Sequence, residues 1–156
     1  MTTREEIKGE WLLQREKWGL AGWELKLSRQ RRHLGYCKPV RRTISVSLLY
    51  MERNPFHIMK DTLLHEIAHA VHFIESGNTG HNNDWKEVAR RVGCTPVRCA
   101  SLEGLRVPEG KYAGVCRSCG KTVQFYRQIR RSYSCSACSP KRYDPRFILE
   151  ITKNNF

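Results

Sequence analysis

The segment Thr62-Leu63-Leu64-His65-Glu66-Ile67-Ala68-His69-Ala70 decides how the first part of this chain folds. It lies within an apolar-periodic stretch that begins after Asn54-Pro55 and ends near Ser76-Gly77. Asn54 as the N-cap and Pro55 at the first helical position favour a helix start, and Gly77 favours a helix end, so the pattern predicts one long helix. Because residues four apart share a helix face, His65 and His69 can bind one zinc ion at Zn–N distances of about 2.0–2.1 Å.

The carboxylate between these histidines gives the motif its expected chemistry. Glu66 projects about 100° round the helix from His65, beside the ion rather than onto it. A carboxylate in that place can take a proton from a water whose pKa the ion has lowered, and can pass the proton to a leaving amine. The motif therefore indicates peptide hydrolysis with Glu66 as the general base.

A catalytic zinc usually keeps three protein ligands and leaves one position for water. His81 is the best candidate for the third ligand, because it lies in a Gly-containing turn that can fold back over the long helix. Eleven residues separate it from His69. The other histidines of the first part are not expected to be ligands: His33, His57 and His72. His72 shares the helix face but lies nearly two turns beyond His65, so we expect it to line the site.

Two other interpretations of the motif remain open. An H-E-x-x-H pattern can occur by chance, and a histidine pair on a helix is often a surface feature. Apolar neighbours nevertheless predict that these histidines are partly buried: Leu63, Leu64, Ala68 and Val71. The second alternative is a non-catalytic, zinc-containing nucleic-acid-binding protein in which the helical zinc is structural or vestigial.

The sequence around this helix predicts an α+β domain over residues 1–108. Thr3 and Glu6 fit a capping box at the start of a first helix that ends near Trp18-Gly19. Alternating apolar residues then predict a small antiparallel sheet from three segments: 23–27, 34–38 and 43–49. A further helix follows the third histidine, with Asp84 as its expected cap and Gly93 at its end. Residues 94–110 read as a linker, so we place a domain boundary near 108.

Four cysteines predict a second zinc site in residues 109–156. Cys116, Cys119, Cys135 and Cys138 form two C-x-x-C pairs separated by fifteen residues, which is typical of a zinc ribbon. Four thiolates close a tetrahedral shell, so this zinc is expected to be structural. A redox dithiol is the alternative that this spacing disfavours. The segment 122–126 reads as a strand that pairs with 133–135. The remaining cysteines are expected to be small buried residues: Cys37, Cys94 and Cys99.

The charge of the chain points to polyanionic partners. The formal net charge is +13, and residues 111–156 hold ten Lys and Arg against only Asp144 and Glu150. Cations interleaved with aromatic residues suit single-stranded or distorted DNA. The bland alternative is a solvated basic surface whose aromatic residues only pack the ribbon. The candidate nucleic-acid contacts are Arg117, Lys121, Arg127, Arg130, Arg131, Lys141, Arg142, Tyr126 and Tyr133.

Composition bounds the class of protein and its compartment. A chain of 156 residues with 40% hydrophobic and 28% charged residues is typical of a folded globular protein. No run approaches the roughly 18 apolar residues of a membrane helix, so no membrane partner is expected. The first residues lack the apolar stretch of a secretory signal. We therefore expect a protein that is not secreted and works in the cytoplasm, nucleoid or nucleus, where clustered cysteines favour metal over disulfides.

Taken together, these residues resemble the SprT-like family of zinc metallopeptidases, which includes the DNA–protein crosslink protease Spartan. The resemblance rests on Thr62–Ala70, on His81–Lys86 and Ala89–Gly93, and on the cysteine ribbon at the C-terminal end. Gly35–Cys37 and Ile44–Ser47 are similar to the sheet region that precedes the helix. One departure is Asn82, where the family often has Gly.

The resemblance implies a zincin-like α+β peptidase domain at residues 1–108, followed by a basic zinc ribbon at residues 109–156. It also implies DNA-dependent activity, two zinc ions per chain and proteins bound or crosslinked to DNA as substrates. His65, His69 and His81 would then be the catalytic zinc ligands.

Overall fold

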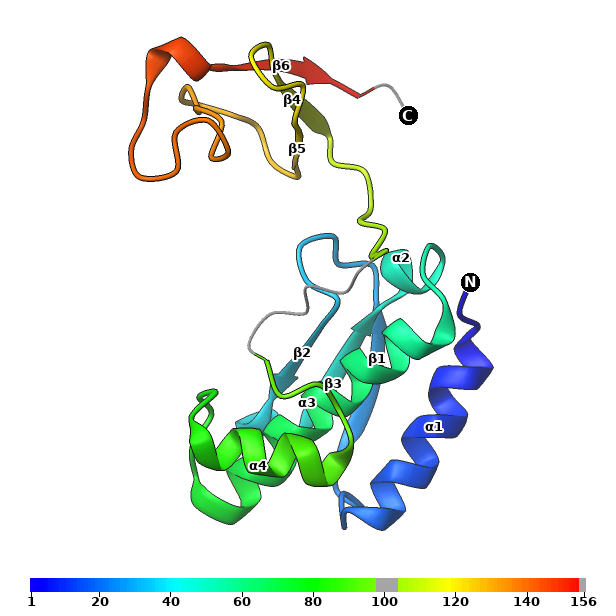
Figure 1. Ribbon diagram of the computed structural model, residues 1–156. Coiled ribbons are helices and arrows are strands. Elements are labelled where there is room, and N and C mark those ends of the chain that lie inside the picture. The colour runs from blue at the N-terminus through cyan, green and yellow to red at the C-terminus, as the bar shows by residue number, and fades with distance from the viewer. Residues whose placement is uncertain (98–103, 155–156) are drawn as a thin grey trace. The chain divides into compact units, whose positions relative to one another are not determined.

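A computed structural model describes residues 1–97 and 104–154 of the chain (Figure 1). The chain divides into two compact units, Met1–Pro108 and Glu109–Phe156, which we call the helical unit and the ribbon unit. Each is described by itself. The predicted α+β class is confirmed, with helices and a small sheet in the first unit and a small β structure carrying the four cysteines in the second. Cys99 and part of the predicted linker lie outside the described residues.

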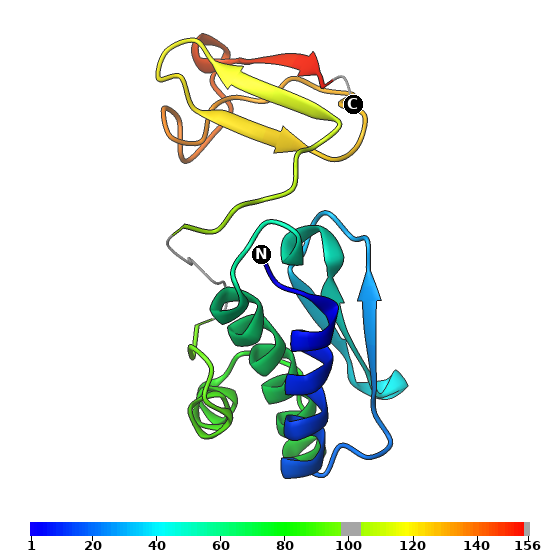
Figure 2. The same cartoon turned by 90° about the vertical axis from the view of Figure 1, so that its right-hand side faces the viewer.

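The helical unit packs its helices against one sheet. Its helices are α1 (Arg4–Lys17), α2 (Leu48–Met51), α3 (Phe56–Ser76) and α4 (Asn83–Val92), and its strands are β1 (Glu24–Ser28), β2 (Gly35–Lys38) and β3 (Thr43–Ser47). A 3-10 turn, η1 (Pro39–Arg41), joins β2 to β3. Figure 2 shows α1, α3 and α4 on the same side of the sheet. The long helix α3 is central, because it contacts α1, α4, β2 and β3.

The predicted capping box at the start of α1 is confirmed. The hydroxyl of Thr3 accepts a hydrogen bond from the Glu6 N–H at 3.2 Å, and the Glu6 carboxylate accepts one from the Thr3 N–H at 2.7 Å. Two backbone donors that the helix leaves unpaired are thereby satisfied. Farther along α1, the buried carboxylate of Glu10 pairs with the Lys60 ammonium of α3 at 3.0 Å.

The sheet is mixed rather than wholly antiparallel. Its order is β1-β3-β2, with β2 antiparallel to β3 and β1 parallel to β3. The chain reverses between β1 and β2 and again at η1, so β3 regains the direction of β1 and enters between the two earlier strands. The buried side chains of Ile44 and Val46 then face the helices.

Two helices have N-cap residues other than those predicted. Pro55 is the N-cap of α3, so the prediction that Asn54 caps this helix is wrong. Asn54 is fully buried and forms three 2.8 Å hydrogen bonds with the backbone, to the carbonyls of Tyr50 and Arg106 and from the N–H of Arg106. The predicted cap of α4 was Asp84, whereas Asn82 accepts a 2.8 Å hydrogen bond from the Trp85 N–H.

Helices α3 and α4 both end as predicted, on a glycine. Gly77 ends α3 with φ 71° and Gly93 ends α4 with φ 94°, in the left-handed region that other residues rarely adopt. Between them the chain turns back, and α4 packs along α3 through one apolar face: Trp85, Val88, Ala89 and Val92.

The ribbon unit is a small antiparallel sheet with its own core. Its strands are β4 (Tyr112–Cys116), β5 (Thr122–Phe125) and β6 (Leu149–Lys153), in the order β5-β4-β6, and η2 (Pro145–Phe147) precedes β6. The prediction that 122–126 pairs with 133–135 is wrong. Residue Ser134 instead forms an isolated bridge with Ile148, and β5 pairs with β4, a strand that the sequence pattern did not reveal.

No helix among the described residues combines the length and apolar character needed to cross a membrane.

Candidate functional site

Three histidines of the helical unit converge on one point. His65 and His69 lie one turn apart on α3, and His81 comes from the connection between α3 and α4. The Nε2 atom of His81 lies 3.1 Å from the Nε2 of His65 and 3.0 Å from that of His69. One ring nitrogen from each histidine lies within 4.8 Å of the others, so the three could hold a metal ion.

Hydrogen bonding alone explains this arrangement poorly. A neutral imidazole nitrogen carries either one proton or one lone pair, each directed in the ring plane. The single Nε2 of His81 faces two other ring nitrogens at nearly equal distances, so it cannot make two well-directed hydrogen bonds. A metal ion among the three nitrogens accepts all three lone pairs, and tetrahedral Zn–N distances of about 2.0–2.1 Å place ligand nitrogens about 3.3 Å apart. The donor set therefore fits a metal better than a hydrogen-bonded cluster.

The two clustered histidines of α3 are held in the neutral form that binds metal. Burial, with a smaller effect of the nearby His81, lowers the pKa of His65 to about 4. Burial likewise lowers the pKa of His69 to about 3, with the other histidines adding to the effect. Since metal ligands must be deprotonated, these rings are ready to bind a cation near neutral pH.

Trp85 packs against all three imidazoles. Its ring centroid lies 4.8 Å from that of His65, 5.1 Å from that of His69 and 4.4 Å from that of His81. The indole is fully buried, and it is nearly stacked on His69, with 30° between the planes. The cap from Asn82 fixes this residue relative to His81, which immediately precedes Asn82. The start of α4 therefore supplies both a ligand and the surface on which the ligands rest.

Glu66 lies between α3 and the inner face of β2. Its carboxyl is 8% exposed, and burial raises its pKa to about 8, although a hydrogen bond from the backbone N–H of Cys37 lowers the value in part. Gly35 makes this approach feasible, because a Cβ at that position would lie 3.0 Å from the Cγ of Glu66 and 2.9 Å from the Ser45 carbonyl oxygen. Burial of the Cys37 thiol also raises its pKa, to about 12.

The other histidines of this unit stay outside the three-histidine group. His33 and His57 are exposed and are not members of the cluster, in line with the absence of a spacing argument for either as a ligand. His72 is 1% exposed, and neither ring nitrogen has a hydrogen-bond partner among the described residues. Its side chain contributes to the buried surroundings of His69 and is not one of the three clustered ligands.

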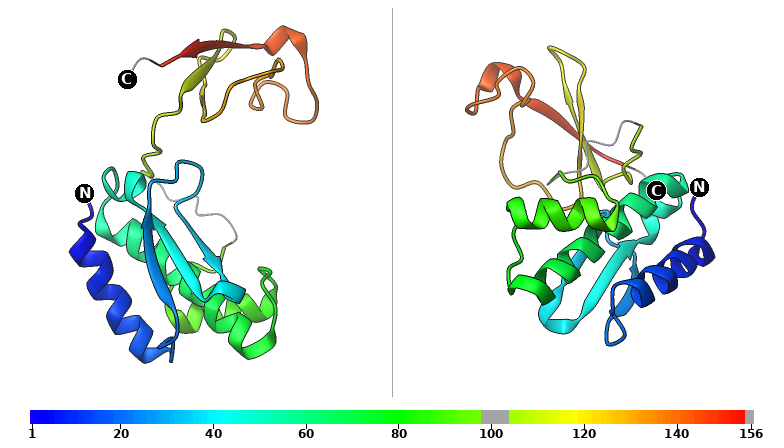
Figure 3. Two further views of the ribbon diagram at one scale, coloured as in Figure 1. Left: turned by 180° about the vertical axis from the view of Figure 1, so that it is seen from behind. Right: turned by 60° about the horizontal axis from the view of Figure 1, so that its bottom comes forward.

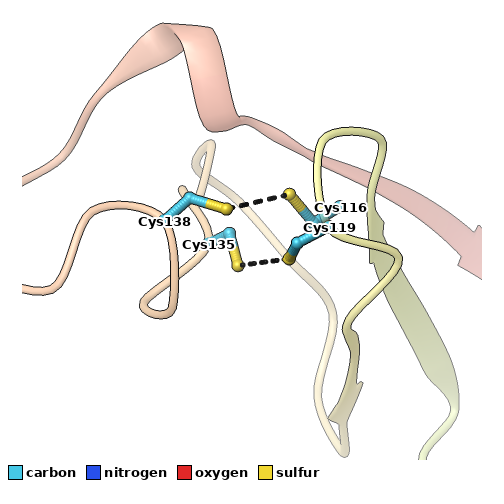
Figure 4. A group of neighbouring side chains, drawn as sticks. All are labelled: Cys116, Cys119, Cys135 and Cys138. Carbon is cyan, nitrogen blue, oxygen red and sulfur yellow. Dashed lines mark hydrogen bonds between the residues drawn. The ribbon is translucent and has the colours of Figure 1, made fainter.

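The four cysteines of the ribbon unit form a second cluster (Figure 4). The Sγ atoms of Cys116 and Cys138 lie 3.9 Å apart, and those of Cys119 and Cys135 lie 3.6 Å apart. These distances exceed a disulfide bond of about 2.05 Å. They match the spacing of about 3.8 Å between sulfurs on a tetrahedral zinc with Zn–S bonds of about 2.3 Å.

Two backbone turns present these thiols. In the first turn, the Gly120 N–H donates to the Cys116 carbonyl at 2.8 Å, with Gly120 at φ 71°. In the second, the Ser139 N–H donates to the Cys135 carbonyl at the same distance. The backbone N–H of Cys138 donates to the Cys135 thiolate and lowers its pKa to about 7. The second turn therefore favours a metal-binding thiolate before any metal arrives.

The ribbon unit brings four of the nine predicted nucleic-acid residues to one cleft. The cleft has a volume of about 490 Å³, and its predicted members are Arg131, Tyr133, Lys141 and Arg142. The guanidinium of Arg131 lies 5.1 Å from the centre of the Tyr133 ring. Serine hydroxyls and the half-exposed Tyr143 complete the lining.

The other predicted contacts lie elsewhere on this unit. Arg117 forms an ion pair with Glu150 of β6, so its charge is already matched. The remaining predicted residues are not among those that line the cleft: Lys121, Arg127, Arg130 and Tyr126. Tyr133 packs on Phe125, with 5.2 Å between ring centres, and so belongs partly to the ribbon core.

Sequence reasoning missed three features of the histidine site. Trp85 was not predicted to contact the ligands, although its position in the first turn of α4, four residues after His81, could have indicated this contact. Gly35 and Cys37 were noted only as part of the sheet. Their approach to Glu66 depends on contacts between β2 and α3, for which the sequence carries no local signal.

Comparison with protein families found that the model of the SprT-like family matches residues 9–106. Comparisons with curated proteins and with solved structures found no match. The matched segment contains the three histidines, Glu66, Trp85 and the whole sheet of the helical unit.

We predict that Glu66 makes the metal-free helical unit less stable as the pH rises. Its pKa in the folded chain, about 8, is above the ordinary value of 4.5, so its contribution to stability is present below pH 4.5 and is lost as the pH rises through 8. Glu66→Gln removes this loss. The stability advantage of the metal-free variant over wild type should grow between pH 5 and pH 8 by at least about 1.4 kcal/mol, the equivalent of one pKa unit.

Tryptophan fluorescence during urea unfolding measures this effect, because all four tryptophans lie in the helical unit. The lowered histidine pKa values act on both proteins alike and cancel in the difference. Glu75→Gln, at an exposed carboxylate on the same helix, is the control and should give no such trend. An advantage that stays constant with pH would show that Glu66 is ionised in the metal-free fold.

Proposed function

The chain belongs to the SprT-like family, and from this premise we propose that it is a zinc-dependent endopeptidase that cleaves proteins bound or crosslinked to DNA. The observation that carries the proposal is the position of Glu66. It follows a clustered histidine directly in sequence, is buried, and is held by the backbone of β2 rather than by an ion pair among the described residues. If this carboxylate served only the stability of the fold, a cationic partner at that depth would make it less unfavourable than it is without one.

Zinc is the metal that best fits both donor sets. Three neutral imidazoles with no fourth protein ligand in the group are typical of catalytic zinc, and four thiolates are typical of structural zinc. When bound to the three imidazoles, zinc supplies Lewis acidity toward the scissile carbonyl and the attacking water. The ribbon zinc would supply folding free energy to a unit whose core is small.

Glu66 then acts as the proton carrier. A divalent cation beside the carboxyl favours the charged form, so it would lower the pKa of Glu66 from about 8 into the range that a general base needs near neutral pH. The carboxylate accepts a proton from the attacking water and delivers it to the leaving amine. The N–H of Cys37 keeps one carboxylate oxygen in place while the other works.

The edge of β2 offers a binding site for the substrate backbone. Leu34 accepts a hydrogen bond from the Ser47 N–H, and since partners alternate in an antiparallel pair, Gly35 and Cys37 direct their backbone groups away from β3. No strand of the described helical unit pairs with that edge. An extended peptide that adds to it would lie beside Glu66.

The ribbon cleft supplies the proposed contact with DNA. Its three cations can bind phosphates, and Tyr143, with 53% of its surface exposed, offers a ring on which an unpaired base can stack. The ribbon would thereby concentrate the peptidase near proteins held on single-stranded or distorted DNA.

We predict two zinc ions per chain, lost separately. Purified wild type should contain about two zinc ions by elemental analysis. His69→Ala should leave one, because the four thiolates are untouched, and Cys119→Ser should also leave one. His57→Ala, at an exposed histidine outside the cluster, should keep both. A wild-type protein with a single zinc that survives in His69→Ala would contradict a zinc site on α3.

We predict that Glu66→Gln abolishes cleavage while zinc content and DNA affinity stay near wild type. The variant lacks the base, and general-base assistance is typically worth about 10²–10⁴-fold in rate. The substrate is a protein crosslinked to a single-stranded oligonucleotide, and cleavage is followed on a denaturing gel. Glu75→Gln should cleave as wild type does. Equal cleavage by wild type and Glu66→Gln, or no cleavage by either, would leave the non-catalytic zinc protein as the better description.

We predict that Arg131→Ala combined with Arg142→Ala weakens binding of single-stranded DNA about tenfold. Because two phosphate contacts are lost, the slope of log affinity against log salt should fall by about 1.4. The matched control is Arg117→Ala with Arg146→Ala. It removes the same charge from guanidiniums that already pair with Glu150 and Asp144, so it should change affinity little. Equal losses in both double variants would show that only net charge matters.

A further inference from the structure

The positive charge of the helical unit comes from one segment. Residues 25–51 contain seven Lys and Arg and no Asp or Glu. The rest of residues 1–108 contains eleven Lys and Arg against twelve Asp and Glu, so it is close to neutral. The segment corresponds almost entirely to the sheet and its turns, from β1 to α2. The sheet therefore carries the whole excess charge of this unit.

This sheet has one face without helices. Figure 3 (left) shows the three strands from the side opposite to α3, and no helix of the helical unit lies in front of them in this view. The side chains that alternate toward α3 are apolar or small: Leu25, Leu27, Ile44, Val46, Gly35 and Cys37. Their neighbours along each strand must point to the open face, because successive side chains of a strand alternate.

The open face presents cations. Strand register places Lys26, Ser45 and Tyr36 in one row and Thr43 beside Lys38 in the next, with the side chains of Thr43 and Ser45 buried. The Lys38 ammonium lies 4.8 Å from the centre of the Tyr36 ring, and Lys26 and Lys38 are both exposed. The single carboxylate of this face, Glu24, lies 3.7 Å from Lys26, and both side chains of this pair are more than half exposed.

Arginines extend the charge at both ends of the face. Arg29, Arg31 and Arg32 follow β1, and Arg41 and Arg42 end the turn between β2 and β3. All but Arg31 are exposed, and the ion pair between Arg29 and Glu52 is a loose contact at 3.9 Å. A strand of five residues is about 15 Å long, which matches the axial rise of four or five nucleotides of B-form DNA at about 3.4 Å each.

We propose that this open sheet face, defined by Lys26, Arg29, Arg32, Tyr36, Lys38 and Arg41, is a second nucleic-acid-binding surface that contacts the phosphate backbone. The proposal rests on the DNA association proposed above and adds a contact within the helical unit, independent of the ribbon cleft. Charge complementarity selects the partner. A face of exposed cations suits phosphates, whereas a membrane-binding surface needs an apolar layer to insert, and this face offers none beyond Val40 in the turn.

The strand β2 connects this surface to the proposed catalysis. Tyr36 and Lys38 lie on its open face, while Gly35 and Cys37 on its other face contact Glu66. Nucleic acid on the open face would therefore lie one strand away from the general base. A protein attached to that nucleic acid would be held within reach of the β2 edge.

The test uses the full chain with two triple variants of equal charge. Arg32→Ala, Lys38→Ala and Arg41→Ala together remove three cations of the face, whereas Lys8→Ala, Lys17→Ala and Arg90→Ala remove three exposed cations of α1 and α4. The face variant should bind a single-stranded oligonucleotide about tenfold more weakly and lose about two units of salt slope, for three phosphate contacts at about 0.7 each. The control should stay within about twofold of wild type.

A second measurement avoids mutation. Lysine acetylation mapped by mass spectrometry should show Lys26 and Lys38 protected by the oligonucleotide, while Lys8 and Lys17 stay reactive. Equal binding by the two triple variants, or unprotected Lys26 and Lys38, overturns this surface while the ribbon cleft still stands. A face variant that loses binding to anionic phosphatidylserine vesicles but not to DNA identifies a membrane surface and also overturns it. No DNA binding by wild type overturns both proposals.

Discussion

The structure depends on three imidazoles, one buried and two half-buried, whose ring nitrogens face one point. Bringing these rings together without enough well-directed hydrogen bonds is unfavourable, and protonation cannot relieve it because burial lowers the pKa of His65 and His69 far below neutrality. A cation among the three nitrogens would resolve this conflict. The convergence of the three ring nitrogens also explains the geometry around the site. His81 reaches α3 only because this helix ends at Gly77 and the chain turns back into α4.

The parts of the site that follow a local period could be predicted from the sequence. His65 and His69 depend only on the helical repeat, and the ribbon thiols depend on two short turns with fixed spacing, so both clusters follow from residue positions. The strand order could not be predicted in the same way. The placement of β3 between β1 and β2, and of β4 beside β5, is decided by contacts between distant segments. Helix caps failed for a related reason, because Asn54 gains more from three buried hydrogen bonds to a distant loop than from capping α3.

The least predictable part is the support behind the ligands. Trp85 resembled an ordinary core residue because its pattern is that of a helix face packed on another helix. Its contact with all three imidazoles exists because Asn82 starts α4 at the residue after His81. A rigid aromatic surface limits the rotamers of three side chains at once. The histidines therefore lose less conformational entropy when they bind a metal. Glu66 depends in the same way on Gly35, whose missing side chain lets β2 approach α3.

The two metal clusters differ in a way that assigns them different tasks. Four thiolates around one point leave no position for a further ligand, and two of them are buried in the small ribbon core, so an ion there can only hold the turns together. Three imidazoles leave the fourth coordination position of an ion open. The acidic residue next to His65 in sequence is Glu66, whose carboxyl has a pKa that burial raises and that a bound cation would lower. Under the proposed mechanism, metal binding and base activation would be coupled at Glu66, because the positive charge that attracts the water would also ionise the group that deprotonates it. Without that charge the raised pKa favours the protonated carboxyl at neutral pH, so the metal-free chain would lack the proposed base.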